Sequence, residues 1–152
     1  MAVVNPKNTV GRDPKYREHL ERIEESGECP FCPERLHAEH PNPIFADNDL
    51  WQATDNAYPY EGATNHVLLI PRQHIETVSD MDGNTWLAMK DIVEKVVDQR
   101  CIKGAAFLMR FGATSHTGAS VHHLHAHVIN GVERVDGSKL ILALVGFASQ
   151  EL

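Results

Sequence analysis

Apolar side chains recur with two different periods along this chain, and each period predicts one type of element. From about residue 80 to residue 100 they recur at steps of three and four, which is the spacing of one face of an α-helix. The side chains of this face are Trp86, Met89, Val93, Val96 and Val97. Within residues 121–130, apolar and polar side chains largely alternate, which is typical of a β-strand with one covered face. The pattern therefore predicts one long helix and one strand with two different faces.

Shorter apolar runs predict further strands of a mostly antiparallel sheet. Two of them flank the turn sequence Asp47-Asn48-Asp49 and predict a β-hairpin. A third, HVLLIP, ends in proline and predicts a buried strand. These further strands are expected over residues 44–46, 50–54, 66–71, 105–111 and 140–145. Together with the long helix, they predict a domain of the α+β class.

The N-terminal residues predict a helix behind a loosely held polar lead-in, which covers residues 1–12. Asp13 followed by Pro14 is typical of a helix start, because the aspartate can cap the helix and proline suits its first turn. Gly27 then predicts the helix end. Residues 33–43, PERLHAEHPNP, are rich in proline and histidine and are expected to form a loop.

Charge and composition narrow the classes of partner. The 152 residues carry a formal net charge of −7, which argues against a protein that binds nucleic-acid backbones through a basic face. The start of the chain lacks the apolar run of a secretory signal, and no run approaches the roughly 18 apolar residues of a membrane span. We therefore expect a cytoplasmic protein with no nucleic-acid and no membrane partner. A local positive pocket can still bind one phosphorylated ligand.

Two of the three cysteines form the sequence Cys29-Pro-Phe-Cys32. Three cysteines do not make a disulfide framework, and in a reducing compartment such a pair is typical of metal binding or redox chemistry. A redox pair would follow a strand and open a helix, whereas this pair follows a polar helix, so zinc is favoured. Two thiolates need two more ligands for a closed zinc site, and the spacing alone offers His37 and His40.

Three histidines lie two residues apart in the sequence SVHHLHAHVI, residues 120–129. On a strand, His123, His125 and His127 share one face, and the apolar residues between them take the other. Such a face is consistent with a metal centre, or with nucleophilic catalysis by one imidazole that titrates near neutrality. Because the three positions lie in a line, a tetrahedral metal could use only two of them comfortably.

The sequence SVHHLHAHVI resembles the signature of the histidine triad family of nucleotide hydrolases and transferases. The resemblance extends to NAYPY at residues 56–60, to HVLLIPRQH at residues 66–74 and to the cysteine pair ahead of them, in the expected order. It implies a histidine triad domain over residues 28–130, with a lead-in and helix over residues 1–27 and an extension over residues 131–152 that packs on the same domain. It further implies a zinc knuckle beside the N-terminal helix, and a homodimer formed through the long helix and the adjacent strand.

For the chemistry, the resemblance implies a nucleotide substrate and three catalytic side chains. His125 would attack an α-phosphorus and form a nucleotidyl-histidine intermediate, while His127 and Ser120 would hydrogen-bond the phosphate or the departing oxygen. The loop over residues 112–118 would present backbone N–H groups to phosphate oxygens. The nucleotide would be bound by Phe45, Asp55, Asn56, His66 and Gly118.

The implied substrate is a dinucleoside polyphosphate or another adenylated small molecule, cleaved at its α-phosphate. Two alternatives stay open: a phosphorylase, in which phosphate replaces water as the acceptor, and a nucleotide-binding regulatory module without turnover. The second is kept open by Ala119, which stands where many members of the family carry a glutamine that contacts the phosphate.

The resemblance also offers a different zinc site. It implies that Cys29 and Cys32 are joined by His74, which follows the strand-ending proline, and by His123, the first histidine of the triad. We prefer this set to the two nearer histidines, because it ties a structural zinc to the histidine strand. Magnesium is expected only as a companion of the substrate.

Overall fold

The computed structural model describes residues 2–143 and residue 146. Its centre is one five-stranded sheet with the order β1-β2-β3-β5-β4, in which every neighbouring pair is antiparallel. The strands are β1 (Ile44–Asp47), β2 (Trp51–Asp55), β3 (Asn65–Pro71), β4 (Ala106–Arg110) and β5 (His125–Asn130). The predicted α+β class with an antiparallel sheet is confirmed.

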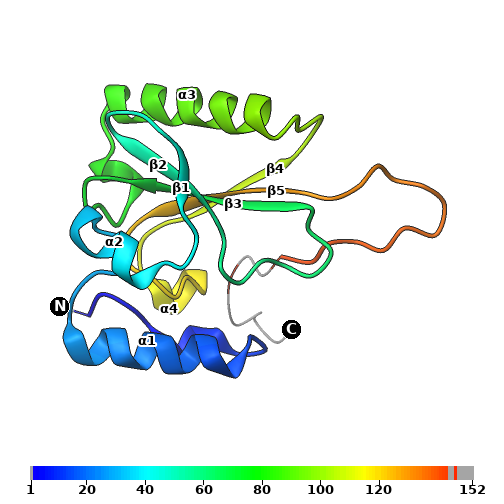
Figure 1. Ribbon diagram of the computed structural model, residues 1–152. Helices are drawn as coiled ribbons and strands as arrows, with labels where there is room; N and C mark the ends of the chain where they lie inside the picture. The colour runs from blue at the N-terminus through cyan, green and yellow to red at the C-terminus, as the bar shows by residue number, and fades with distance from the viewer. Residues whose placement is uncertain (1, 144–145, 147–152) are drawn as a thin grey trace.

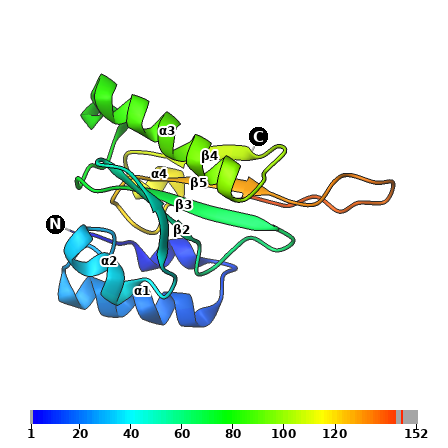
Figure 2. The ribbon, with the colours of Figure 1, turned by 45° about the horizontal axis from the view of Figure 1, so that its top comes forward.

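Helices cover both faces of the sheet (Figure 1). α3 (Gly83–Gln99) lies along one face, and α1 (Pro14–Ser26) and α2 (Pro33–Glu39) lie on the other, as the turned view in Figure 2 also shows. Three short helical turns are the 3-10 helices η1 (Pro6–Thr9) and η2 (Val78–Asp80), and α4 (Thr114–Thr117). In the part of the chain that the structure describes, no helix is long and apolar enough to cross a membrane.

The two long helices begin and end where local sequence signals predict. At α1, the Asp13 side chain accepts a hydrogen bond from the Lys15 N–H, and Gly27 ends the helix with a positive φ of 68°. At α3, the Asp82 side chain accepts a hydrogen bond from the Thr85 N–H at 2.8 Å. These caps satisfy backbone groups that helix ends would otherwise leave unpaired.

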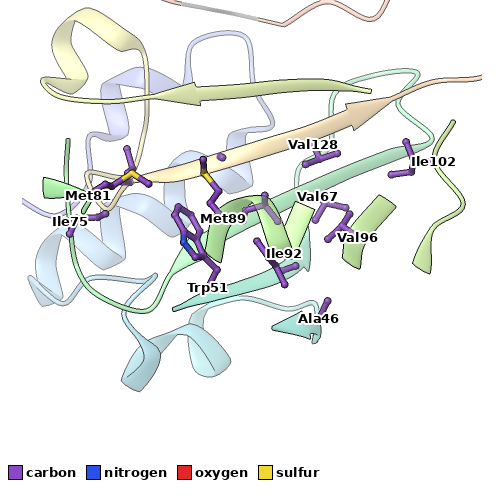
Figure 3. Close-up of a cluster of buried hydrophobic side chains, with 14 residues drawn as sticks. Ala46, Trp51, Val67, Ile75, Met81, Met89, Ile92, Val96, Ile102 and Val128 are labelled. Carbon is purple, nitrogen blue, oxygen red and sulfur yellow. The ribbon is translucent and has the colours of Figure 1, made fainter. Parts of the chain in front are cut away.

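The main core lies between α3 and the sheet (Figure 3). Its buried side chains include Met89, Ile92 and Val96 of α3, and Trp51, Val67, Leu69, Ala126 and Val128 of the strands. Trp86, which we expected on the buried face of the helix, is 42% exposed. It lies in the first turn of α3, where the Trp51 indole N–H donates to the Thr85 carbonyl at 2.9 Å and the Trp51 ring takes the sheet side.

A second core lies between the sheet and the N-terminal helices. Leu20 and Ile23 of α1 and Leu36 of α2 pack there with Leu68 and Ile70 of β3. Because helices cover β3 from both sides, six of its seven residues are buried, which agrees with the unbroken apolar run in its sequence.

The first residues of the chain are not a loosely held lead-in. Val4 is buried and pairs with Val121 in an isolated antiparallel bridge. The Asn5 N–H donates to the Ser120 carbonyl at 2.7 Å. The prediction was wrong because this segment satisfies its polar groups against a part of the chain that is distant in sequence, and local periodicity carries no sign of such pairing.

Two segments that we expected to be loops contain helices. α2 lies within residues 33–43 and starts at Pro33, because proline suits the first position of a helix. α4 lies within residues 112–118 and ends at Gly118, whose φ is 70°. These helices are only 7 and 4 residues long, and helices this short leave no clear apolar period in a sequence.

Two predicted strands also differ. The histidine strand, expected over residues 121–130, begins at His125, because Val121 pairs with the N-terminal segment and does not continue β5. Of the strand expected over residues 140–145, residues 140–143 form no strand, and residues 144 and 145 lie outside the described part of the chain. The chain after β5 extends from the end of the sheet and turns back as a long, largely exposed segment (Figure 1).

Candidate active site and metal centre

The strand register brings three predicted site residues and one arginine to the same face of the sheet. His125 and His127 lie on β5, and Arg110 of β4 stands directly opposite His125. Side chains opposite each other on antiparallel strands share a face. His66 of β3 lies diagonally across from His127 on that face, because His127 pairs with the residue two positions further along β3. The apolar residues between the histidines belong to the core under α3, so the predicted alternation is confirmed.

A cleft of about 490 Å³ opens over this face of the sheet. The predicted site residues in its lining are Asn56, Gly118, Ser120, His125 and His127. Side chains from the N-terminal segment line it as well, among them Arg12 and Tyr16. The cleft is therefore formed between the histidine face of the sheet and the N-terminal segment.

His125 has one ring nitrogen available at this cleft. Its Nδ1 donates to the backbone carbonyl of His123 at 2.9 Å, so the unprotonated nitrogen of the neutral ring is Nε2. Burial lowers the pKa of His125 to about 4; the hydrogen bond to His123 opposes this shift, and the charge of Arg110 adds to it. At neutral pH the ring is therefore neutral and Nε2 carries a lone pair, which is the state that a nucleophilic imidazole needs.

Two hydrogen bonds in series set the protonation of His127. The Tyr60 N–H donates to His66 Nδ1 at 3.0 Å, which leaves the proton of a neutral His66 on Nε2. That Nε2 lies 2.9 Å from His127 Nδ1 and donates there, so His127 carries its own proton on Nε2. Burial is the largest cause that lowers the pKa of His66 to about 4 and the pKa of His127 well below its usual value. Both rings are therefore neutral at neutral pH.

Two hydrogen-bond donors converge beside His125. Arg110 Nη2 lies 3.4 Å from His127 Nε2 and 3.5 Å from the Tyr60 hydroxyl. Since Arg110 Nη2 and His127 Nε2 both carry protons, the space that they face suits an acceptor such as a phosphate oxygen. A neutral imidazole with a free lone pair, placed beside such donors, can attack a phosphorus atom and stabilise the charge that develops on its oxygens.

Ser120 connects this cleft to α1. Its hydroxyl shares a hydrogen bond with the Tyr16 phenol, and its carbonyl accepts the hydrogen bond from the Asn5 N–H. Burial raises the pKa of the Tyr16 phenol, and the hydrogen bond from Ser120 only partly offsets this effect. The phenol therefore stays protonated at neutral pH.

The backbone N–H groups of the loop before Ser120 are largely bonded within the protein. Four of them donate to carbonyls of this chain: Gly112, His116, Thr117 and Gly118. The expectation that this loop offers its N–H groups to phosphate is wrong for these four residues, because three of them bond within the turn of α4 and the Gly112 N–H donates to the Glu76 carbonyl after β3.

The four residues of the preferred zinc site come together next to the histidine strand. The ligand atoms of Cys29, Cys32, His74 and His123 all lie within 4.8 Å of one another. Cys29 Sγ is 3.3 Å and Cys32 Sγ is 3.8 Å from His123 Nδ1. Cys32 Sγ is 3.4 Å from His74 Nδ1. Such spacings suit the corners of a tetrahedron around one ion with bonds of about 2.0–2.3 Å.

Acceptors hold the outer nitrogens of both histidines in this cluster. His123 Nε2 donates to the Pro71 carbonyl at 2.9 Å, and His74 Nε2 lies 3.4 Å from the Glu76 carboxylate. Each contact places the lone pair on Nδ1, the nitrogen that faces the thiols. Two thiolates and two imidazoles oriented in this way form a donor set that suits zinc, so the residues present fit that ion.

The two histidines nearest to the cysteines in sequence lie elsewhere. His37 is exposed on α2, and His40 Nδ1 accepts a hydrogen bond from the Asn42 N–H at 3.3 Å. The cysteines reach more distant histidines because β3 and β5 bring those histidines to them.

Arg100 holds two of the predicted nucleotide-binding residues. Its guanidinium lies 4.2 Å from the centroid of the Phe45 ring and 2.7 Å from the Asp55 carboxylate. Neither residue is among the described residues that line the cleft. Asn56 does line the cleft, and its Nδ2 lies 3.1 Å from His66 Nε2. Of the five predicted nucleotide-binding residues, the structure thus places Asn56, His66 and Gly118 beside the catalytic candidates.

Three side chains at the site were not anticipated from the sequence: Arg12, Tyr16 and Arg110. Arg110 is the lone charge of the predicted strand over residues 105–111. A single charge in an otherwise apolar strand was a usable signal, because burial of an unpaired charge is costly. Arg12 and Tyr16 carried no such signal, since their place at the cleft depends on how the N-terminal segment packs.

Comparisons of sequence point to one family. The family model described as scavenger mRNA decapping enzyme C-term binding matches residues 28–141. The purine nucleoside phosphoramidase of Escherichia coli strain K12 is 28% identical over 99 residues, which make up 63% of this chain and 82% of that protein.

Solved structures share the fold. A histidine triad (HIT) family hydrolase from Clostridium thermocellum has 29% identity and a TM-score of 0.52, and the match covers 70% of this chain and 91% of that one. A zinc-bound histidine triad family protein from Mycobacterium smegmatis has 20% identity and a TM-score of 0.56, with 82% and 86% of the two chains covered. Since the family model spans well over half of the sequence and the histidine face has the expected geometry, this chain belongs to the histidine triad family.

Proposed function

We propose that this protein is a histidine triad nucleotide hydrolase that cleaves its substrate at an α-phosphate through a nucleotidyl intermediate on His125. One observation carries the proposal. Nδ1 of His125 donates to the His123 carbonyl at 2.9 Å, and this bond leaves Nε2 as the lone-pair nitrogen of a residue that lines the cleft. The family match and the phosphoramidase relative support the same chemistry.

The reaction has two steps at phosphorus. First, a bond forms between His125 Nε2 and the α-phosphorus, and the bond from phosphorus to the leaving atom breaks with its electron pair going to that atom. His125 keeps the proton on Nδ1, so the adduct is an imidazolium that the His123 carbonyl stabilises. Second, water attacks the phosphorus, the electron pair of the P–N bond returns to Nε2, and the proton of the water passes to solvent. The products are a nucleoside monophosphate and the leaving group.

Other side chains of the cleft would bind the substrate and stabilise charge. We assign His127, Ser120 and Arg110 to the oxygens of the α-phosphate or to the departing oxygen, because their donors border the His125 ring. For the nucleoside we propose Asn56, His66 and Gly118, of which His66 acts through its hydrogen bond to His127. That Phe45 and Asp55 bind the base and ribose stays a prediction.

Two substrate classes fit this chemistry. One is a dinucleoside polyphosphate, and the other is an adenylated small molecule, which includes nucleoside phosphoramidates such as those named for the relative from Escherichia coli. In both, the bond that breaks joins the α-phosphorus to an oxygen or nitrogen of the leaving group. A leaving nitrogen then takes up a proton from solvent, whereas a leaving phosphate departs as an anion.

We further propose that Cys29, Cys32, His74 and His123 hold one structural zinc ion. The ion would fix His123, whose carbonyl orients His125, so it supports the nucleophile without a part in the reaction. Among the described residues this cluster is the one group of three or more potential ligands that lie close enough together to share an ion. Magnesium would therefore enter with the phosphates of the substrate.

Product analysis with the full chain tests the proposed reaction. The purified protein is incubated with diadenosine tetraphosphate or with adenosine 5′-phosphoramidate, in the presence and absence of inorganic phosphate. Hydrolysis releases AMP from both without added phosphate. Phosphate-dependent release of ADP from the polyphosphate would instead identify a phosphorylase. No turnover of either compound, combined with nucleotide binding, would identify the regulatory module.

Trapping of the intermediate tests the role of His125. The protein is incubated with substrate labelled at the α-phosphorus, denatured rapidly at alkaline pH, where a P–N bond is stable, and separated from free substrate. Label should then remain on the wild-type protein. In His125→Ala the label should be absent and turnover should fall by about 10⁴-fold or more, with zinc content and nucleotide binding retained. His116→Ala is the matched control, because this histidine is exposed in the neighbouring helix. Equal turnover by His125→Ala and His116→Ala would refute the assignment.

A further inference from the structure

The N-terminal segment is built into the cleft although it lies outside the family match, which begins at residue 28. The Asn8 amide donates to the Thr114 carbonyl at 2.8 Å and to the Ala119 carbonyl at 2.7 Å. The His122 N–H donates to the Val3 carbonyl at 3.0 Å. These bonds attach the segment to the stretch that leads into the histidine strand, so its side chains have fixed positions over the site.

Arg12 is the cation that this segment adds. Its Nη2 donates to the Tyr58 carbonyl at 3.0 Å, and its guanidinium carbon lies 5.3 Å from the centroid of the Tyr60 ring and 5.7 Å from that of Tyr16. Arg110 reaches the hydroxyl of the same Tyr60 from β4. Two guanidinium groups, one from the N-terminal segment and one from the sheet, therefore contact one tyrosine beside the histidines.

Such a pair of like charges favours an anionic ligand. Both arginines act on the neighbouring imidazoles, since each lowers the pKa of His66 and of His127. Of the two acidic side chains among the described residues that line the cleft, Glu39 pairs with Arg35 at 2.7 Å, and Glu18 is exposed. A cleft with this local charge, in a chain with a net charge of −7, concentrates anions.

Two features of the chain reduce the number of other groups that could donate hydrogen bonds to a phosphate beside these arginines. Ala119, directly before Ser120, has no polar side chain that could contact a phosphate. Four N–H groups of the preceding loop are bonded within the protein, as described above. A guanidinium supplies several donors with a fixed geometry, which suits phosphate oxygens at this cleft.

We propose that Arg12 binds a second phosphate, the one carried by the leaving group, while Arg110, His127 and Ser120 face the α-phosphate. The Tyr60 ring contacts Arg12 and also lies near His127, with ring centroids 6.4 Å apart, so one aromatic ring is shared by Arg12 and the histidine face. The subsite selects substrates whose leaving group is itself a phosphate ester or phosphoanhydride. This inference rests on the proposed function and extends it to the choice of leaving group.

The test compares two substrates in one variant. Arg12→Met removes the cation and keeps an unbranched side chain of similar length. We expect kcat/KM for diadenosine triphosphate, whose leaving group is ADP, to fall by roughly 10- to 100-fold, as for loss of a charge-assisted hydrogen bond. The loss for adenosine 5′-phosphoramidate, which has one phosphorus, should be at least tenfold smaller. Arg17→Met is the matched control, because Arg17 is exposed on α1, pairs with Glu21 and lies outside the cleft lining.

Several outcomes overturn the inference, and they differ from failure of the proposed function. Equal losses for both substrates in Arg12→Met, or no loss for the polyphosphate, would reject the subsite. Hydrolysis of the phosphoramidate alone by the wild type would also reject it, while the His125 mechanism would stand. Absence of turnover and of labelled protein with both compounds would reject the proposed function itself. If Arg12→Met does not fold, Arg12→Gln takes its place, because it also removes the charge, and the same larger loss for the polyphosphate is expected.

Discussion

At the scale of single residues, His123 and His125 differ in which ring nitrogen is available to bind a ligand or to react. The outer Nε2 of His123 donates to the Pro71 carbonyl, so Nδ1 is available to the cysteine thiols. In His125 the relation is reversed, because Nδ1 donates to the His123 carbonyl and Nε2 remains for the cleft. One backbone carbonyl per ring thus decides which chemistry each imidazole can perform.

The buried pair of His66 and His127 should make stability depend on pH. In the unfolded chain His66 takes up a proton near pH 6.5, whereas in the folded protein it stays neutral down to a pKa of about 4. Between these values the unfolded state binds more protons, so the free energy of unfolding should fall as pH falls, by on the order of 1–3 kcal/mol for this residue. Arg12, Arg110 and His125 also face the ring and oppose its protonation.

Urea unfolding at a series of pH values from 7 to 5 measures this effect. The variant His66→Gln cannot titrate, so its free energy of unfolding should fall less steeply with acidification than that of the wild type. Protonation of the metal ligands affects both proteins alike and cancels in the comparison. Parallel curves for the wild type and the variant would show that His66 does not contribute.

At the scale of elements, the cysteine–histidine cluster brings together three parts of the chain that are distant in sequence. It is the one group of potential metal ligands that does so among the described residues. Cys29 and Cys32 lie between α1 and α2, His74 follows β3, and His123 precedes β5. The two ends of the cluster are 94 residues apart in sequence, so an ion there closes a long loop around the second core. A metal ion bound by this cysteine–histidine cluster would therefore connect the N-terminal helices to β3 and β5, the two strands that carry the site.

Removal of the metal should therefore destabilise the fold and the site together. We expect one zinc per chain by elemental analysis, and a loss of several kcal/mol, up to roughly 10, in the free energy of unfolding after chelation. His74→Ala should lower zinc content and stability, because it removes one of four ligands. The control His37→Ala changes an exposed histidine outside the cluster and should retain both. Full stability of the wild type after chelation would contradict a structural metal.

At the scale of the whole molecule, the strand order leaves β4 at one edge of the sheet. Phe107 on this strand is 47% exposed, and Trp86 and Leu87 on α3 are 42% and 64% exposed. A strand edge that is unpaired among the described residues, and exposed apolar side chains on the neighbouring strand and helix faces, are features that another chain can cover. This surface agrees with the homodimer that the family resemblance implies through α3 and β4, which we retain as a proposal.

Sedimentation equilibrium should then give about twice the chain mass of 17.0 kDa. Phe107→Glu places a charge in the proposed interface and should shift the protein towards the monomer, because burial of an unpaired charge is costly. Leu50→Glu is the control, since Leu50 is 38% exposed beside β2, on the other side of the sheet order from β4. A monomeric wild type, or equal behaviour of the two variants, would rule out this interface.

Some parts of the fold followed from short-range signals. Asp13 and Gly27 bound α1, and the β1–β2 hairpin surrounds the expected turn. The alternation around His125 predicted which side chains face the core and which face the cleft. Such predictions succeed because caps, turns and periodicity act over a few residues. Short helices such as α2 and α4 lack a period and were missed.

By itself, the sequence determined the class of fold, the shared strand face of His125 and His127, and the kind of chemistry that such a face can support. Only the tertiary structure decided which nitrogen each ring has available and that Arg12 and Arg110 lie at the cleft. The reason is physical: side-chain alternation is a local property of a strand, whereas the partner of each imidazole and the neighbours of each charge come from strand register and from packing of segments far apart in the chain.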